Sequence, residues 1–199
     1  MSTREFTAKD MKNSLIKLLP AMTLVALLIS AAQSQSVPSD NELPNFSRVT
    51  ENLYRGAQPT SAGFRRLKEL GVKTVINLRD EDELARAEKE TVESAGLRYY
   101  NVGLPGLSRP SDEQVARVLA IIDTPDNAPV FIHCRRGSDR TGTIVGVYRI
   151  SHEGWTSERA LAEAKRYGLS WAEFGMKRYI SEYYERLPKA KPADATANR

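Results

Sequence analysis

Residues 129–151 read PVFIHCRRGSDRTGTIVGVYRIS and contain, in this order, a strand, a loop and a helix. The segment from Pro129 to His133 is an apolar run bounded by a polar loop, which is typical of a strand buried on both faces. A helix is expected from Thr141 to Ser151. The loop therefore joins the carboxyl end of a strand to the N-terminus of a helix, a position where backbone N–H groups bind anions.

The loop carries a cysteine and an arginine at a spacing that suits such a site. Cys134 leaves the strand, and Arg140 stands six residues later. The residues between them can encircle one tetrahedral oxyanion, and they are Arg135, Arg136, Gly137, Ser138 and Asp139. Gly137 permits the positive φ of a tight loop, and the Arg140 guanidinium can close the ring with two parallel hydrogen bonds. The amides and the helix N-terminus favour the thiolate of Cys134, which is the nucleophilic form, and Thr141 is placed to donate a hydrogen bond to the sulfur.

A lone cysteine is more often an inert buried thiol than a nucleophile. Here, however, Gly137, Arg140, Thr141 and Gly142 all stand at fixed offsets from Cys134. At roughly one chance in fifteen for each position, a coincidence is on the order of one in fifty thousand. The pattern therefore predicts a catalytic cysteine.

Strand and helix patterns alternate on both sides of this unit. Strands are expected at 53–56, 72–78, 97–102 and 129–133, and helices at 59–70, 81–95, 111–123, 141–151, 156–167 and 170–187. Within 81–95 we expect Leu84, Ala87 and Val92 to face inward. Aromatic residues at helical spacing are expected in the core, namely Trp155, Trp171, Phe174, Tyr179 and Tyr183. The alternation predicts an α/β fold with three layers, in which helices flank both faces of a central, mostly parallel sheet of four to five strands. Ligands bind such sheets at the carboxyl ends of the strands.

The composition of the 199 residues limits the kinds of site that the chain can build. One cysteine and two histidines exclude an internal disulfide, a cysteine-rich zinc finger and an all-histidine zinc site. The net charge is +4, and two of these charges belong to residues 1–32. The remaining charge is too small to indicate a nucleic-acid partner, and none is expected.

Residues 1–32 have the pattern of an export signal. Lys12 and Lys17 precede an uncharged run from Leu18 to Ala32, which ends in small residues. This order is typical of a secretory signal peptide, so the protein is expected to be exported, either periplasmic or secreted. An uncleaved membrane anchor is the alternative, although the run is short for a span of about 20 residues, and membrane contact is expected only in that case. The start is Met1 or Met11. Residues 33–45 are expected to form a linker, 46–187 the folded domain and 188–199 a mobile tail.

The stretch HCRRGSDRTG (133–142) resembles the signature loop of cysteine-dependent protein tyrosine and dual-specificity phosphatases, His-Cys-x5-Arg-Ser/Thr. Two more stretches, YRGAQP (54–59) and VKTVINLRDE (72–81), are similar to the small atypical dual-specificity phosphatases of bacteria, plants and fungi. The resemblance implies a phosphocysteine intermediate on Cys134, phosphoryl binding by Arg140, and neither metal nor cofactor. It also implies that His133 is an orienting neighbour that helps to hold the thiolate. The implied partner is a phosphorylated protein, an inositol phosphate or a phosphoinositide.

Two other functions stay open at this point. A sulfurtransferase also uses a lone cysteine in an anion-binding loop after a strand, although Arg140, Thr141 and Gly142 at the helix start favour phosphate chemistry. A phosphate-binding module without turnover is the other alternative. The intact pair of Cys134 and Arg140 argues against it.

The group that protonates the leaving oxygen is not evident. The larger tyrosine phosphatases have a mobile Trp-Pro-Asp loop for this purpose, but the corresponding segment here, NVGLPGLSRP (101–110), contains no acid. Asp139 is our first candidate, because its place before Arg140 resembles lipid phosphatases of the myotubularin type. Asp112, in the first turn of the next helix, is the alternative. Each residue could instead have a purely structural role. Asp139 could form an ion pair with a neighbouring arginine, and Asp112 could be stabilised by the N-terminus of its helix.

Four charged residues complete the expected site. Arg135 and Arg136 make the pocket more cationic than one phosphate requires, which favours polyanionic substrates. Arg79 and Asp80 end a strand on the same side of the sheet. They are expected either to line the pocket or to form an ion pair within their loop.

Overall fold

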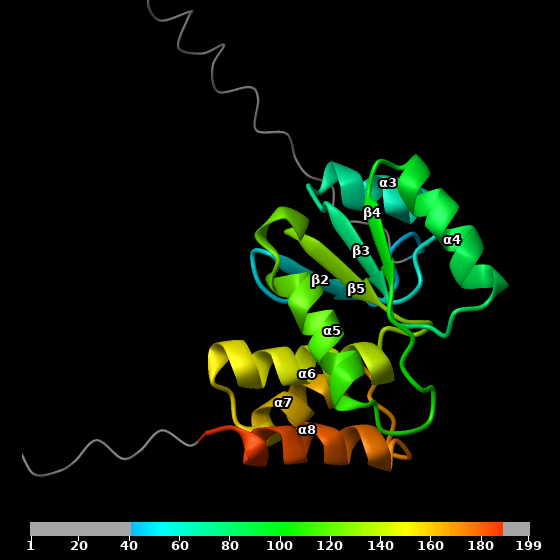
Figure 1. Ribbon diagram of the computed structural model, residues 1–199. Coiled ribbons are helices and arrows are strands. Elements are labelled where there is room, and N and C mark those ends of the chain that lie inside the picture. The colour runs from blue at the N-terminus through cyan, green and yellow to red at the C-terminus, as the bar shows by residue number, and fades with distance from the viewer. Residues whose placement is uncertain (1–40, 189–199) are drawn as a thin grey trace, which may run out of the picture. The chain divides into compact units, whose positions relative to one another are not determined.

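The computed structural model describes residues 41–188, and in this part of the chain five strands form one sheet (Figure 1). The strands are β1 (Ser47–Arg48), β2 (Leu53–Gly56), β3 (Thr74–Asn77), β4 (Arg98–Asn101) and β5 (Val130–His133). Their order is β1-β2-β5-β3-β4, and only the β1–β2 pair is antiparallel. The predicted, mostly parallel sheet is therefore confirmed. At the end of β5, His133 lies between Gly56 of β2 and Asn77 of β3.

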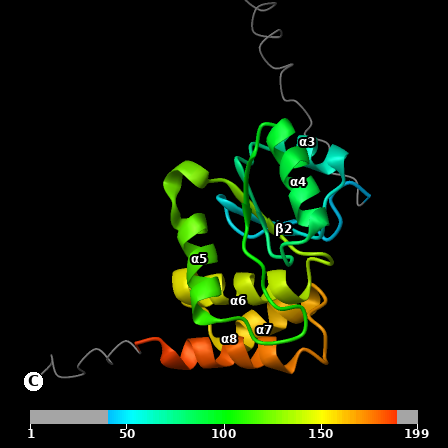
Figure 2. The same ribbon diagram turned by 45° about the vertical axis from the view of Figure 1, so that its right-hand side comes forward.

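Helices cover both faces of the sheet, as predicted (Figures 1 and 2). They are α3 (Ser61–Glu69), α4 (Glu83–Ser94), α5 (Asp112–Asp123), a short 3-10 helix (Pro125–Asn127), α6 (Asp139–Glu153), α7 (Ser157–Arg166) and α8 (Phe174–Arg186). Because strand side chains alternate between faces, Val75 of β3 packs with α3 and α4, whereas the next residue, Ile76, packs with α5 and α6. A further apolar cluster joins α6 to α7 and α8.

Helix ends follow the predicted capping residues. The Ser111 side chain and Gln114 form a reciprocal capping box at the start of α5, and Thr60 caps α3. Gly71, just beyond the end of α3, has a φ of 83°. These local signals fix where the helices begin and end, so they also fix the loops at the carboxyl ends of the strands.

The buried face of α4 differs from the prediction. Leu84 and Ala87 are exposed, and the buried side chains are Ala85, Glu88 and Val92. Asp82 caps the helix by accepting a hydrogen bond from the Ala85 N–H at 2.8 Å. The prediction was wrong because it took the apolar residues as the mark of the buried face, whereas this helix buries a carboxylate that has partners in the core.

The predicted helix 170–187 also begins later, at Phe174. Residues before it form a turn, and in it the Ser170 N–H donates to the Asp139 carboxylate at 2.8 Å. Helical spacing therefore does not apply to Trp171. Trp171 and Phe174 are exposed and the prediction that they are core was wrong, while Tyr179 is buried as expected.

The packed part of the chain begins before Phe46, so the predicted linker 33–45 extends too far. Leu43 is buried among apolar residues that include Phe64 and Phe131. The Pro44 carbonyl accepts a hydrogen bond from the Ala57 N–H at 2.8 Å. The predicted signal or anchor (1–32) and the tail beyond Pro188 lie outside the described residues. Within 41–188, no helix has the length and apolar character needed to cross a membrane.

Candidate active site

The predicted loop lies where the parallel strands end. Cys134 follows β5 directly, and α6 begins at Asp139, two residues earlier than predicted. A pocket of about 450 Å³ opens at this point, lined by Gly106, Leu107, Cys134, Arg135, Arg136, Asp139 and Arg140. The structure therefore brings the predicted nucleophile, the loop arginines and the first candidate acid into one pocket.

Cys134 lies in a pocket surrounded by positive charge. Its exposed fraction is only 3%, and it lines the pocket. The loop after it turns into the first residues of α6, a 15-residue helix whose N-terminal end carries a partial positive charge. Arg140, in the first turn of this helix, adds a full positive charge at the same pocket. Together these groups favour the binding of an anion such as phosphate at the pocket.

The loop is fixed from behind by a buried arginine that the sequence analysis did not single out. The Arg55 Nη2 atom donates to the Gly137 carbonyl oxygen at 2.7 Å. Burial lowers the pKa of Arg55 to about 10, while the negative charge of Glu163 partly offsets this effect. The guanidinium also lies 3.9 Å from the centre of the Tyr167 ring. Arg55 therefore holds the backbone of the anion-binding loop at the edge of β2.

Gly137 has no room for a side chain. Its φ is 69°, and a Cβ atom there would lie 2.5 Å from the carbonyl carbon of Gly56 and 2.6 Å from the Ala57 nitrogen. We expect Gly137→Ala to lower the free energy of unfolding by about 3 kcal/mol, from the strained φ and the backbone clash together. Urea unfolding followed by circular dichroism measures this loss.

Gly154→Ala is the matched control, because Gly154 has nearly the same φ, 66°, and nothing within 4 Å of its Cβ position. It should lose only about 1 kcal/mol, the conformational part. Equal losses in the two variants would show that the loop does not press against β2.

His133 is fully buried beside the nucleophile and has a partner on a different element. Its Nε2 atom lies 2.9 Å from the Oε1 atom of Glu88, which is also buried. The contact explains why α4 turns a carboxylate into the core, since a buried charge is stable only with a partner. Glu88 thus fixes the orientation of His133, while a role of His133 in holding the thiolate stays a prediction.

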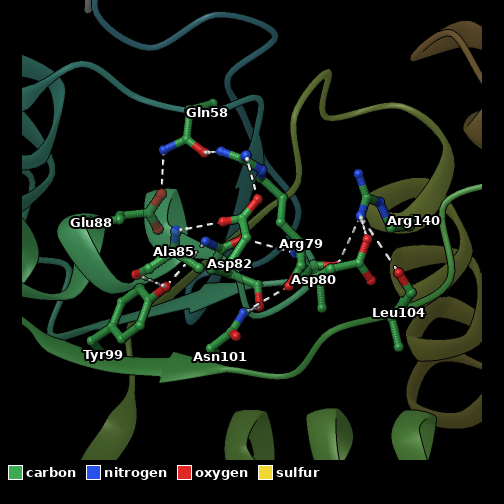
Figure 3. Close-up of polar contacts among 12 residues, drawn as sticks. Gln58, Arg79, Asp80, Asp82, Ala85, Glu88, Tyr99, Asn101, Leu104 and Arg140 are labelled. Carbon is green, nitrogen blue, oxygen red and sulfur yellow. Dashed lines mark hydrogen bonds and ion pairs between the residues drawn. The ribbon is translucent and has the colours of Figure 1, made fainter.

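Glu88 is the start of a polar chain along the ends of the strands (Figure 3). The Glu88 Oε2 atom accepts a hydrogen bond from the Gln58 amide, and Gln58 Oε1 accepts one from Arg79 at 3.0 Å. Arg79 also forms an ion pair with Asp82, with 3.5 Å between its Nη2 atom and the Asp82 Oδ2 atom. Burial raises the pKa of nearby Tyr99 to about 12, and the charge of Glu88 contributes to this rise. Arg79 is therefore part of a structural network rather than of the pocket lining.

Arg140 reaches from α6 across to the loops after β3 and β4 (Figure 3). Its Nη1 atom lies 3.4 Å from the Leu78 carbonyl oxygen and 3.5 Å from the Leu104 carbonyl oxygen. Asp80 approaches the same atom at 4.0 Å from an exposed position. These contacts orient the guanidinium at the pocket. The ion-pair partner of Asp80 is therefore Arg140, whereas Arg79 pairs with Asp82.

Asp139 lines the pocket but is not free. One carboxylate oxygen accepts a hydrogen bond from Arg136, and the other accepts from the Ser170 N–H. The ion pair considered as its structural role is therefore present, and it does not remove Asp139 from the pocket. Thr141 is fully buried, and its Oγ1 has no hydrogen-bond partner in the described part of the chain. The predicted contact of Thr141 with Cys134 is thus not formed in this structure.

The structure places Asp112 away from this pocket. Its carboxylate accepts hydrogen bonds from Arg186 at 2.7 and 3.0 Å and from the Tyr179 hydroxyl at 2.7 Å. The Arg186 hydrogen bonds, followed by that of Tyr179, hold the pKa of Asp112 below its usual value. The alternative acid is thus occupied in joining α5 to α8.

Glu173 is a second acid near the loop that the sequence analysis missed. It is buried at the N-terminal end of α8, and burial raises its pKa, with a further rise from the charge of Asp139.

No group of three or more His, Cys, Asp or Glu residues within 41–188 could hold a metal ion.

A model of the DSP-PTPase phosphatase fused to NAD+ kinase matches residues 28–181, which is most of the chain. The chain belongs to the DSP-PTPase family. The dual specificity protein phosphatase TpbA of Pseudomonas aeruginosa (strain UCBPP-PA14) is 32% identical over 126 residues, 63% of this chain and 55% of TpbA. The inositol diphosphatase SIW14 of Saccharomyces cerevisiae is 29% identical over 144 residues, 70% of this chain and 50% of SIW14. The chain thus spans about half the length of these relatives.

Solved structures of the same two relatives resemble this DSP-PTPase chain in fold. The core catalytic domain of SIW14 superposes with a TM-score of 0.65 at 28% identity, covering 71% of this chain and 86% of that domain. TpbA of P. aeruginosa superposes with a TM-score of 0.62 at 28% identity, covering 77% of this chain and 91% of the TpbA chain. The family resemblance and the α/β fold expected from the sequence are both confirmed.

Proposed function

We propose that this DSP-PTPase chain hydrolyses phosphoric monoesters through a phosphocysteine intermediate on Cys134. The observation that carries the proposal is the single pocket in which Cys134 and Arg140 meet at the N-terminus of α6. Such a pocket holds a phosphate next to a thiolate, while amides and a guanidinium bind the phosphate oxygens.

The reaction has two displacements at phosphorus. The Cys134 thiolate attacks, the S–P bond forms, and the ester P–O bond breaks as Asp139 gives its proton to the leaving oxygen. Water then attacks the phosphocysteine, and Asp139 takes a proton from it. The S–P bond breaks, which releases inorganic phosphate and restores the thiolate. Arg140 stabilises the charge on the equatorial oxygens in both steps.

The proposed substrates are phosphotyrosine or phosphoserine/threonine in proteins, or phosphorylated inositol or lipid. The relative TpbA is named a dual specificity protein phosphatase and has been solved in complex with pTyr. SIW14 and an Arabidopsis thaliana relative, DSP3, are named inositol diphosphatases. Arg135 and Arg136 are exposed beside the nucleophile, and positive charge at a pocket raises the local concentration of polyanions.

The test is release of phosphate by the full chain from p-nitrophenyl phosphate, phosphopeptides, phosphoinositides and inositol polyphosphates. We expect turnover that a chelator does not reduce and that vanadate inhibits competitively. A chain that releases no phosphate but transfers sulfur from thiosulfate to cyanide is a sulfurtransferase. One that binds these compounds without turnover is a phosphate-binding module, and either result contradicts the proposal.

We propose Asp139 as the general acid, because its carboxylate lines the pocket with Cys134. Asp139→Asn should slow hydrolysis of an alkyl phosphate far more than hydrolysis of p-nitrophenyl phosphate, whose leaving group needs no proton. By the usual size of general acid catalysis, the loss on the alkyl substrate should be about 100-fold or more. The alkaline limb of the pH–rate profile should disappear as well.

Asp112→Asn is the matched control and should change the two rates little and equally, since Asp112 is bound to Arg186 and Tyr179. If Asp139→Asn instead lowers both rates by the same factor, Asp139 only shapes the loop. A selective loss in Asp112→Asn would assign the acid to that residue.

We also propose that the chain is exported, on the pattern of residues 1–32. Residues 1–45 fused to a reporter that is active only outside the cytoplasm should give activity, and the mature protein should begin near Gln33. Replacing Leu24 and Leu27 with Arg should abolish reporter activity. An intact N-terminus recovered in the membrane fraction would indicate the anchor, and an inactive fusion would contradict export.

A further inference from the structure

Large apolar side chains stand uncovered around the mouth of the active-site pocket. Four large apolar side chains are strongly exposed within 41–188. Three of them, Leu107 (88%), Trp171 (81%) and Phe174 (68%), belong to segments beside this pocket, and the fourth, Leu84 (63%), lies on α4. Leu107 lines the pocket itself. Trp171 and Phe174 lie in the turn before α8 and at its first residue. Exposed apolar groups that gather around one site indicate a contact surface.

Direct contacts bring the two segments together next to the signature loop. The Ser170 N–H, one residue before Trp171, donates to the pocket residue Asp139 at 2.8 Å. A Cβ atom at Gly175, one residue after Phe174, would lie 2.7 Å from the Arg109 nitrogen, so the first turn of α8 lies against the loop that carries Leu107. Figures 1 and 2 both show this loop passing beside the start of α8.

The accessible charges of these segments are all positive. The two acids, Asp139 and Glu173, are buried. The basic side chains of the signature loop, of residues 102–110 and of residues 168–178 reach solvent, and they are Arg109, Arg135, Arg136, Arg140, Lys177 and Arg178. Asp80, near Arg140, is an exposed acid that borders the pocket from the β3 side. Glu182, further along α8, forms ion pairs with Arg109 and Arg178. The basic side chains still outnumber the acids, so the rim on the α8 side is both apolar and positively charged.

We propose that this rim, formed by Leu107, Trp171 and Phe174 with the basic residues around them, docks on the surface of an anionic lipid bilayer. Trp and Phe are the residues that enter the membrane interface, and Lys and Arg beside them bind anionic headgroups. Lys177 brings a positive charge directly to the two aromatic residues. Its Nζ atom lies 4.6 Å from the centre of the Phe174 ring and donates a hydrogen bond to the Trp171 carbonyl oxygen.

A bilayer suits these side chains better than a peptide does. A peptide is bound by side chains that line a groove, whereas Trp171 and Phe174 are more than two-thirds exposed and so stand clear of the surface. On a bilayer, the phosphate pocket would face the headgroup layer. The docking needs no turnover, so it can be tested independently of the proposed phosphatase activity.

The test follows the fluorescence of Trp171 in the full chain, which has only two tryptophans. Vesicles of phosphatidylglycerol and phosphatidylcholine should shift the emission to shorter wavelength, and brominated lipids should quench it. Both effects should be absent in Trp171→Phe and retained in Trp155→Phe. Because the readout is local to Trp171, it is not produced by residues 1–32 binding the vesicles. If Trp155→Phe is unstable, the difference between the native chain and Trp171→Phe gives the same information.

Charge dependence completes the test. Pure phosphatidylcholine vesicles should give little shift, and 1 M NaCl, where the Debye length is about 3 Å, should reverse the shift in anionic vesicles. Arg178→Glu should lower the apparent affinity for anionic vesicles about fivefold or more, while Leu84→Ser, an exposed leucine on α4, should leave it unchanged. No change at Trp171 while the chain cosediments with vesicles would overturn the proposal. A change on adding a phosphotyrosyl peptide but not vesicles would also overturn it and assign the rim to peptides.

Discussion

Replacing Cys134 with Ser is expected to abolish phosphate release while the fold survives. The serine hydroxyl is not ionised at this site, so the variant lacks the nucleophile that forms the S–P bond. Removal of a catalytic nucleophile lowers turnover by on the order of 10⁴-fold or more. Steady-state hydrolysis of p-nitrophenyl phosphate measures the loss, and an unchanged circular dichroism spectrum and melting temperature confirm the fold.

The native chain offers a direct chemical check on the same residue, because Cys134 is its only cysteine. Iodoacetate below pH 7 should add one carboxymethyl group and inactivate the enzyme, and vanadate should protect against both. The thiolate alone reacts, so alkylation at low pH reports the ionised form. Full activity of Cys134→Ser, or alkylation without loss of activity, would rule out the phosphocysteine mechanism.

The part of the site that the sequence predicted is the part that is local in the chain. Strand β5, the loop and α6 are consecutive, so residue types and offsets were enough to place Cys134 and Arg140 together. The geometry of such a unit follows from short-range constraints, namely a glycine with positive φ and a helix N-terminus. The bounds shifted by one or two residues: α6 runs from Asp139 to Glu153 rather than from Thr141 to Ser151, and β5 begins at Val130 rather than at Pro129.

The supporting residues could not be predicted in the same way, because their partners are distant in sequence. Arg55 contacts Gly137, and Glu88 contacts His133. A charged residue in a short strand and a glutamate in a charged helix both look like surface positions when only periodicity is considered. The sequence did contain one signal for such a partner, namely the histidine at the end of a buried strand, because a buried histidine requires a polar partner.

Trp171 and Phe174 were also misplaced by arguments from local sequence, in this case as buried residues that are in fact exposed. Their aromatic character predicted burial, but the hydrogen bond from the Ser170 N–H to Asp139 ends the regular spacing before α8 begins. A tertiary contact with the active-site loop thus sets where the helix starts. It also places exposed aromatic side chains beside the pocket.

Arg140→Lys should lower kcat/KM about 100-fold or more, although the charge is kept. The guanidinium gives two parallel hydrogen bonds to a phosphoryl group, and a lysine ammonium cannot reproduce this planar fork. The Leu78 and Leu104 carbonyls lie at 3.4 and 3.5 Å from Nη1 and orient the native group. A lysine, which is shorter, would lose both. A 100-fold loss corresponds to about 2.7 kcal/mol of transition-state stabilisation, the usual effect of removing one such donor.

Arg135→Lys is the matched control, because Arg135 lines the same pocket and stands in the same loop but is exposed. It should change kcat/KM by less than about threefold, as expected for a group that acts through its charge alone. Vanadate resembles the transition state, so its affinity should fall in Arg140→Lys by a factor similar to that of kcat/KM and stay nearly constant in Arg135→Lys. A loss below about threefold in Arg140→Lys would show that this guanidinium does not touch the phosphoryl group, and an equal loss in both variants would show that only the summed charge of the pocket matters.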